Sequence, residues 1–241
     1  MIKHKDHFHG SDLEKIEAVY GIKKEDITSF SANVNPLGVS PLLRSTLASH
    51  IDAITSYPDR EYTSLRECIA AYTGTDASQV IVGNGSTELI SLFIQIEHPK
   101  KAMILGPTYS EYEREISLGG GTTLYYPLRE KDDFVLDVDD FTAHLNESID
   151  LLVLCNPNNP TGTVVEKEYL ATLISHNPQV CFVIDQSYEF FTLRPLFSAA
   201  EAAEFPNVLL LHSMTKRYAV PGLRLGYVTG APHLLHRLRT N

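Results

Sequence analysis

The sequence predicts an α/β protein whose sheet is mostly parallel and is covered by helices on both faces. Short, continuously apolar runs recur along the chain, as expected for strands buried on both faces of a sheet. Segments with apolar residues at helical spacing alternate with these runs, which favours parallel strands joined by crossover helices. The runs end abruptly at polar residues or glycine, and ligands bind at the carboxyl ends of the strands in such sheets.

The first part of the chain is irregular, apart from a short amphipathic helix expected at 12–20. The turn-rich segment Asn33–Gly38 contains both Pro and Gly, which indicates an arm laid over another part of the molecule. After this segment, helices and apolar runs alternate without a linker, a repeat or a low-complexity tract. We therefore divide the chain into an N-terminal arm, residues 1–41, and one larger domain, residues 42–241.

The first half of the larger domain shows the alternation clearly. Leu65, Ile69 and Tyr72 recur at helical spacing, and the apolar runs that follow are bounded by Gly or Pro. In chain order we expect a helix at 64–72, a strand at 80–82, a helix at 86–96, a strand at 102–105, a helix at 109–118, a strand at 122–126 and a helix at 138–145.

The second half repeats the theme with stronger apolar runs. The first of them stops at Asn156-Pro157, and later runs stop at Asp185 and at His212-Ser213. In chain order we expect a strand at 151–155, a helix at 166–175, and strands at 180–184, 208–211 and 225–229.

Composition and charge narrow the functional class. The 241 residues include 30 Asp and Glu against 20 Lys and Arg, a formal net charge of −10, which argues against generic nucleic-acid binding. The 3 cysteines are widely separated, so neither a disulfide framework nor a zinc ribbon is expected. No run approaches the roughly 18 apolar residues of a membrane span, and residues 1–10 lack the apolar core of a secretory signal. We expect a cytoplasmic protein that binds neither membrane nor nucleic acid.

A histidine cluster, His4, His7 and His9, lies at the start of the chain. It can be interpreted as a metal-binding tract or as part of a solvated arm. The surrounding residues are charged, so we favour the arm and expect no metal site.

The segment Gly83–Glu88 (GNGSTE) follows an expected strand and opens an expected helix. Glycines let a backbone approach an anion closely, and a helix N-terminus offers free N–H groups and a favourable dipole. An ordinary turn with a Ser or Thr cap is the alternative. The segment is neither GxGxxG nor a Walker loop, so both interpretations stay open on the residues alone.

The segment Asn156–Gly162 (NPNNPTG) ends the run at 151–155. Its prolines, asparagines and glycine fix a rigid turn with few free backbone donors. An ordinary connection does not need so much constraint. We therefore favour a turn that holds an amide side chain toward a ligand over a plain turn.

Two charged residues follow apolar runs. Asp185 ends one run, with Tyr188 three residues later, and a buried carboxylate is costly unless a cation or donors bind it. Lys216 follows another run, and a partly desolvated lysine has a lowered pKa and a nucleophilic amine. Ser213 and Arg224 can supply a hydroxyl and a cation to a phosphate. The alternatives are an exposed helix N-cap at Asp185, a surface lysine and an exposed arginine.

Together these residues supply an amine, a carboxylate, a tyrosine hydroxyl, an amide, an anion cradle and an arginine, as pyridoxal 5′-phosphate (PLP) requires. On these residues, in order from about residue 27 to the end, the sequence resembles the fold type I PLP-dependent enzymes, the aspartate-aminotransferase superfamily. The resemblance implies a sheet of the seven-stranded type. It also implies that residues 42–241 are the PLP-binding large domain and that residues 1–41 are an arm with part of a small domain.

The resemblance further implies roles around the PLP ring. Lys216 would form the Schiff base, and Asp185 would pair with the pyridinium nitrogen. Tyr188 and Asn159 would bind the ring 3-oxygen, and Tyr109 would stack on the ring. The catalytic residues would accordingly be Lys216, Asp185 and Tyr188.

The resemblance also implies how the phosphate is held. Tyr57, in Tyr57-Pro58-Asp59, resembles the tyrosine that reaches the phosphate of the neighbouring subunit, so a homodimer with interface sites is expected. The phosphate ligands within the same subunit would be Gly85, Ser86, Thr87, Ser213 and Arg224.

Within the superfamily, the sequence is similar to the branch of histidinol-phosphate aminotransferase and threonine-phosphate decarboxylase. The shared motifs are Asn33-x-Asn35-Pro36-x-Gly38, the Gly85–Glu88 loop and the stretch from Thr215 to Tyr227. The opening His9-Gly10 and the segment 30–38 look more like the decarboxylase, and we expect His9 and Asn33 near the substrate. Family members continue into a C-terminal small domain with an arginine for the substrate carboxylate, and this domain is expected to be missing here.

The function that the resemblance implies is PLP-dependent amino transfer of the histidinol-phosphate type. Substrates would be an amino acid or phosphorylated amine and a keto acid. After displacement by the substrate amine, Lys216 would act as general base at the substrate α-carbon. The alternatives are threonine-phosphate decarboxylation and a non-catalytic module that retains the fold.

Overall fold

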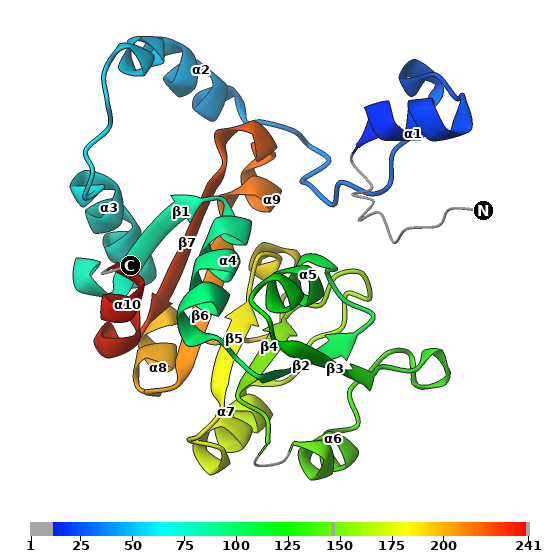
Figure 1. Ribbon diagram of the computed structural model, residues 1–241. Helices are drawn as coiled ribbons and strands as arrows, with labels where there is room; N and C mark the ends of the chain where they lie inside the picture. The colour runs from blue at the N-terminus through cyan, green and yellow to red at the C-terminus, as the bar shows by residue number, and fades with distance from the viewer. Residues whose placement is uncertain (1–11, 146–147, 240–241) are drawn as a thin grey trace.

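The computed structural model describes residues 12–145 and 148–239. Within them, 7 strands form one sheet in the order β1-β7-β6-β5-β4-β2-β3, the central layer in Figure 1. Strand β7 is antiparallel to β1 and β6, and the other neighbouring pairs are parallel, which confirms the predicted sheet. The strands are β1 (Val80–Asn84), β2 (Lys101–Gly106), β3 (Thr122–Pro127), β4 (Leu151–Cys155), β5 (Cys181–Asp185), β6 (Val208–Ser213) and β7 (Leu225–Gly230).

Helices cover both faces of the sheet, as predicted. Helices α6, α7 and α8 pack on one face, and α4, α5 and α10 pack on the other. The helices are α1 (Leu13–Tyr20), α2 (Pro41–Ser49), α3 (Thr63–Thr73), α4 (Ser86–Glu97), α5 (Glu111–Leu118), α6 (Val138–His144), α7 (Lys167–His176), α8 (Ala199–Ala203), α9 (Met214–Tyr218) and α10 (Pro232–Arg239).

The central strands are apolar throughout because their side chains enter both helical layers. In β4, Leu152 and Leu154 pack in the layer of α7, whereas Leu151 and Val153 pack in the layer of α4. All 5 residues of β4 are buried. A strand covered on both faces tolerates no polar alternation, so its sequence is one continuous apolar run.

The sequence prediction omitted α2, α8, α9 and α10. Helices α8 and α9 have 5 residues each, too few for a helical period to appear, and α2 buries none of its residues. Helix α10 buries Leu234, Leu235 and Leu238, so a usable pattern was present there. The antiparallel direction of β7 follows from the short connection 214–224, because a parallel crossover takes about a dozen residues or more.

The described N-terminal part of the chain lies outside the sheet layers. Figure 1 shows α1 and α2 away from the sheet, and the first buried side chain along the described chain is Ile69. Between these helices, Asn35 binds the segment after β6. Its backbone N–H donates to the carbonyl of Lys216 at 2.9 Å, and its Nδ2 donates to the carbonyl of Arg217 at 3.0 Å. The domain boundary expected at residue 42 stays a prediction.

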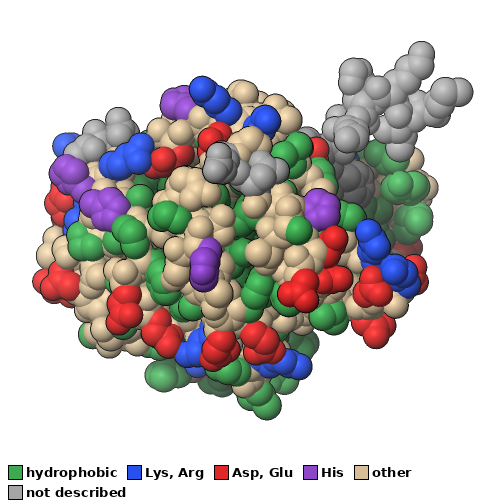
Figure 2. Space-filling view, turned by 90° about the horizontal axis from the view of Figure 1, so that it is seen from below, with side chains coloured by type: hydrophobic (Ala, Val, Ile, Leu, Met, Phe, Trp, Pro, Cys, Tyr) green, Lys and Arg blue, Asp and Glu red, His purple; other side chains and the backbone are tan. Residues whose placement is uncertain are grey.

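The molecular surface carries mixed charge. Figure 2 shows acidic side chains interspersed with basic ones on the face seen from below. Among the helices that the structure describes, none is long and apolar enough to cross a membrane. The histidine cluster at the start of the chain lies outside the described residues.

Candidate active site

A cavity of about 470 Å³ opens at one edge of the sheet, where three parallel strands end. The last residues of β4, β5 and β6 are Cys155, Asp185 and Ser213, and all three line it. This is the edge at which open α/β sheets bind ligands, because the carboxyl ends of parallel strands meet there.

Nearly all the residues that the sequence singled out lie around this cavity. Gly85 adjoins it and packs against Arg224, whereas Tyr57 is fully exposed and is not part of its lining. His9 lies outside the described residues. The expected residues that line the cavity are Asn33, Ser86, Thr87, Tyr109, Asn159, Asp185, Tyr188, Ser213, Lys216 and Arg224.

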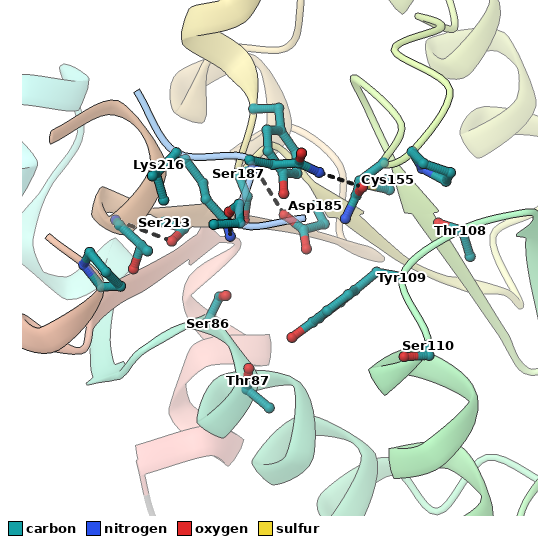
Figure 3. Close-up of a pocket in the computed structure, with 18 of the residues that line it drawn as sticks. Ser86, Thr87, Thr108, Tyr109, Ser110, Cys155, Asp185, Ser187, Ser213 and Lys216 are labelled. Carbon is teal, nitrogen blue, oxygen red and sulfur yellow. Dashed lines mark hydrogen bonds between the residues drawn. The ribbon is translucent and has the colours of Figure 1, made fainter. Parts of the chain in front are cut away.

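Asp185 provides a buried carboxylate at the end of β5, only 3% exposed. Its Oδ2 accepts a hydrogen bond from the phenol of Tyr112 at 2.7 Å. Its Oδ1 accepts the backbone N–H of Ser187 at 2.8 Å (Figure 3). These two donors compensate for burial of the charge, and each oxygen retains a further lone pair for a ligand N–H. The alternative of an exposed helix N-cap is wrong.

Lys216 provides a half-buried amine in α9. Burial lowers the pKa of its ammonium group; nearby Arg224 adds to this effect, and Asp185 opposes it. Its Nζ donates to the carbonyl of Ala32 at 3.4 Å and lies 5.7 Å from the centroid of the Tyr188 ring. An amine with a lowered pKa is neutral in a larger fraction at a given pH, and the neutral form is the nucleophile.

This pKa shift predicts the order in which two lysines titrate. A hydrogen bond to Glu201 raises the pKa of Lys167, whereas burial lowers that of Lys216. As the pH rises, we therefore expect Lys216 to become reactive toward an acylating reagent before Lys167. The measurement is competitive labelling over a pH series, with mass spectrometry giving the midpoint for each lysine. Comparing midpoints rather than absolute rates removes the effect of how easily the reagent reaches each lysine. A midpoint for Lys216 at or above that of Lys167 would contradict a lowered pKa of Lys216.

The N-terminus of α4 and Arg224 form the cationic end of the cavity. Gly85 caps α4 at φ +83° and offers no side-chain acceptor, so first-turn N–H groups are available to an anion. A Cβ at residue 85 would collide with the guanidinium of Arg224, and one at Gly226 would lie 2.5 Å from the backbone nitrogen of Ser86. Glycine is thus favoured at residue 85 chiefly by its positive φ, because the guanidinium can move, and it is required at residue 226 by the close approach of the backbone. The alternative of a Ser- or Thr-capped turn is wrong.

Tyrosine and amide side chains complete the walls. Burial raises the pKa of the phenols of Tyr109 and Tyr188, so both act as hydrogen-bond donors at neutral pH. In Figure 3 the ring of Tyr109 lies across an open space from Asp185. Asn159 accepts at Oδ1 from Nδ2 of Asn33 at 3.0 Å, which ties the arm to the NPNNPTG turn.

Asn158, which the sequence analysis did not single out, links the two loops that carry Tyr109 and Asn159. Its Oδ1 accepts from Oγ1 of Thr108 at 2.9 Å. Its Nδ2 donates to the carbonyl of Pro107 at 2.9 Å and to Oγ1 of Thr161 at 2.8 Å. The rigid turn therefore also fixes the loop that precedes α5.

Sequence reasoning also missed Tyr112, Cys155 and Ser187, which line the cavity. Tyr112 follows Tyr109 by three residues, a spacing that places two side chains on the same side of a helix. This spacing was a usable signal for Tyr112. Cys155 is the last residue of an apolar run and gave no signal. Burial raises the pKa of its thiol to about 12, so it stays protonated at neutral pH.

Solved structures define the class of protein. The L-threonine-O-3-phosphate decarboxylase from Porphyromonas gingivalis matches with a TM-score of 0.80 at 26% identity, over 89% of this chain and 63% of that chain. The histidinol-phosphate aminotransferase from Clostridium acetobutylicum matches with a TM-score of 0.77 at 28% identity, over 87% of this chain and 62% of that chain. The chain therefore has the fold type I architecture of PLP-dependent transferases, as its resemblance implied.

Sequence comparison then gives the family. The family model described as aminotransferase class I and II matches residues 25–241, so the chain belongs to the aminotransferase class I and II family. It is 33% identical over 225 residues to the threonine-phosphate decarboxylase of Salmonella typhimurium, covering 92% of this chain and 62% of the relative. It is 29% identical over 234 residues to the histidinol-phosphate aminotransferase of Caldicellulosiruptor saccharolyticus, covering 95% of this chain and 64% of the relative. The chain thus spans less than two thirds of the length of either relative.

Proposed function

We propose that the protein is a PLP-dependent enzyme that acts on the amino group of a small amino acid or phosphorylated amine. The first candidate reaction is amino transfer of the histidinol-phosphate type. One observation carries the proposal: a single cavity combines the amine of Lys216 with the buried, hydrogen-bonded carboxylate of Asp185. When bound, PLP supplies an aldehyde that condenses with amines and a pyridine ring that accepts electrons from the substrate α-carbon.

The residues around the cavity fit this cofactor in charge and in hydrogen-bonding capacity. A dianionic phosphate suits the uncapped N-terminus of α4 beside Arg224. Asp185 retains acceptor capacity for a protonated ring nitrogen. The remaining polar and aromatic groups follow the expected roles: hydroxyls for the phosphate from Ser86, Thr87 and Ser213, donors for the ring 3-oxygen from Tyr188 and Asn159, and a stacking face from Tyr109.

Lys216 has two tasks in this proposal. Its neutral amine would hold the cofactor covalently through the aldehyde, and the same amine, once free, would move a proton at the substrate α-carbon. The lowered pKa of Lys216 favours both tasks, since both require an unprotonated amine. Asn33, which reaches the cavity from the arm, is the candidate substrate contact within the described residues, and His9 stays a sequence-based prediction.

Threonine-phosphate decarboxylation is the second candidate, favoured by the 33% identical Salmonella relative of that name. The two reactions differ in the bond broken at the α-carbon, C–H for amino transfer and C–C to the carboxylate for decarboxylation. A screen of amino acids and phosphorylated amines with the PLP-loaded protein separates them. Amino transfer yields a carbonyl product and an aminated acceptor, whereas decarboxylation releases carbon dioxide. If neither product forms with any donor, the result would contradict an enzymatic role and would favour the non-catalytic alternative.

We further propose that the active unit is a homodimer in which Tyr57 reaches the phosphate site of the neighbouring subunit. The side chain of Tyr57 is fully exposed, in a segment, residues 51–64, without a buried side chain. Phe30, Leu37 and Ile54 are also largely exposed in this part of the chain, and a partner subunit that covers it would remove these side chains from water. The alternative, that Tyr57 covers the core of its own subunit, does not fit its exposure.

Subunit mixing tests this role of Tyr57. Lys216→Ala and Tyr57→Phe proteins, each impaired alone, are mixed under conditions that allow subunit exchange. If Tyr57 acts across the interface, a mixed dimer has one site with both lesions and one site with neither, so activity is expected to reappear. If it acts within its own subunit, every site keeps one lesion and mixing restores nothing, which would contradict the proposal.

We also propose a cytoplasmic location. Cys68, Cys155 and Cys181 are all free thiols. Unpaired cysteines are typical of proteins kept in the reducing environment of the cytosol.

A further inference from the structure

Tyr112 lies beneath the cavity and is 0% exposed. It belongs to α5, packs among the side chains between that helix and the sheet, and meets the ring of Tyr109 edge to face at a centroid distance of 5.5 Å. Its phenol donates to Oδ2 of Asp185 at 2.7 Å. A hydrogen bond to a carboxylate at this distance is charge-assisted and is stronger than one between neutral groups.

We propose that Tyr112 is a positioning residue that acts through Asp185. Its phenol fixes the orientation of the carboxylate, so that Asp185 can hold a protonated ring nitrogen. This inference rests on the proposed PLP function.

The direction of the hydrogen bonds supports this role. The backbone N–H of Ser187 can only donate, so Oδ1 of Asp185 must accept. Burial and the neighbouring carboxylate raise the pKa of Tyr112 well above its usual value, so the phenol keeps its proton and donates to Oδ2. Both oxygens of Asp185 therefore accept a hydrogen bond from the protein, and the two bonds together hold the carboxylate in one orientation.

Loss of the phenol would change the carboxylate itself. Oδ2 of Asp185 would lose its hydrogen bond from the phenol, and the carboxylate would no longer be held at both oxygens. In the loaded protein, the ring nitrogen would then have a less well placed counter-charge and would hold its proton less firmly. A residue that only fills space would not have this effect.

Tyr126 offers a matched control. It is a buried tyrosine whose phenol also donates to a carboxylate, Oδ2 of Asp140, at 2.7 Å, and it does not line the cavity. Tyr112→Phe and Tyr126→Phe therefore each remove one phenol–carboxylate hydrogen bond while keeping the ring. The two proteins differ in whether that carboxylate is Asp185.

The first measurement is the ¹⁵N resonance of PLP labelled at its pyridine nitrogen and bound to each protein. Tyr112→Phe is expected to move the resonance toward the value of an unprotonated ring, and Tyr126→Phe to leave it at the wild-type position. An unchanged resonance in Tyr112→Phe would overturn the inference. So would a Tyr112→Phe protein that does not fold while Tyr126→Phe does, because Tyr112 would then be structural.

The second measurement is a double-mutant cycle on the dissociation constant of PLP. Tyr112→Phe is expected to weaken binding about tenfold when Asp185 is present, and less than about twofold in an Asp185→Asn background. Equal losses in the two backgrounds would mean that Tyr112 does not act through Asp185. A wild-type protein that does not bind PLP contradicts the proposed function, whereas normal binding with an unresponsive Tyr112→Phe contradicts only the role of Tyr112.

Discussion

Replacing Lys216 by Ala is expected to lower turnover by at least about 10⁴-fold, because one amine attaches the cofactor and moves the proton. General acid–base catalysis alone contributes about 10²–10⁴-fold, and loss of covalent attachment adds to this. The measurement is kcat at saturating PLP with the best donor found in the substrate screen. The lowered pKa of Lys216 adds to the expected effect, since a larger fraction of this amine is neutral at a given pH.

Lys167 is the control for this substitution. Its ammonium group pairs with Glu201 at 2.7 Å, and it does not line the cavity. Lys167→Ala is expected to keep turnover close to that of the wild type. Turnover by Lys216→Ala comparable to that of Lys167→Ala would show that Lys216 has neither task.

Replacing Asp185 by Asn is expected to lower turnover about a thousandfold, or about 4 kcal/mol in activation free energy, with PLP still attached to Lys216. The amide nearly conserves the shape of the carboxylate but removes its charge. Without a counter-charge in this buried site, the ring nitrogen would hold its proton less firmly. An unprotonated ring withdraws electrons less strongly. The measurements are kcat and, separately, the stoichiometry of covalently bound PLP.

Asp140→Asn is the matched control, since Asp140 accepts a tyrosine phenol at the same 2.7 Å distance but lies outside the cavity lining. It is expected to retain turnover near that of the wild type. Near-normal turnover in Asp185→Asn would mean that another group pairs with the ring nitrogen.

The sheet could be predicted from the sequence because a strand buried on both faces has a continuously apolar sequence. Strand β4 was located to the residue, since an uninterrupted apolar run is what two covering layers require. The short helices α8 and α9 could not be located, because 5 residues do not establish a period. The orientation of β7 depends on how a short connection turns back beside β6, which no apolar pattern records.

Much of the candidate site could also be predicted, because its charged residues follow apolar runs. Lys216 and Asp185 stand out as ionisable groups at strand ends, where burial needs a chemical reason. The resemblance of the sequence to a known family then gave the remaining residues their expected roles. Tyr112 was missed because its partner Asp185 lies 73 residues away, and the contact depends on how α5 packs on the sheet. Local spacing shows which side of a helix a tyrosine occupies, but not which carboxylate it meets.

The most direct test of the central claim, that Lys216 carries PLP, is borohydride reduction of the PLP-loaded protein followed by peptide mapping. Reduction makes the bond between the lysine and the cofactor permanent, so the modified residue can be identified by mass. We expect the pyridoxyl group on Lys216, in the segment between Ser213 and Arg224. Label on another lysine, or no label in protein shown to be saturated with PLP, would contradict the claim.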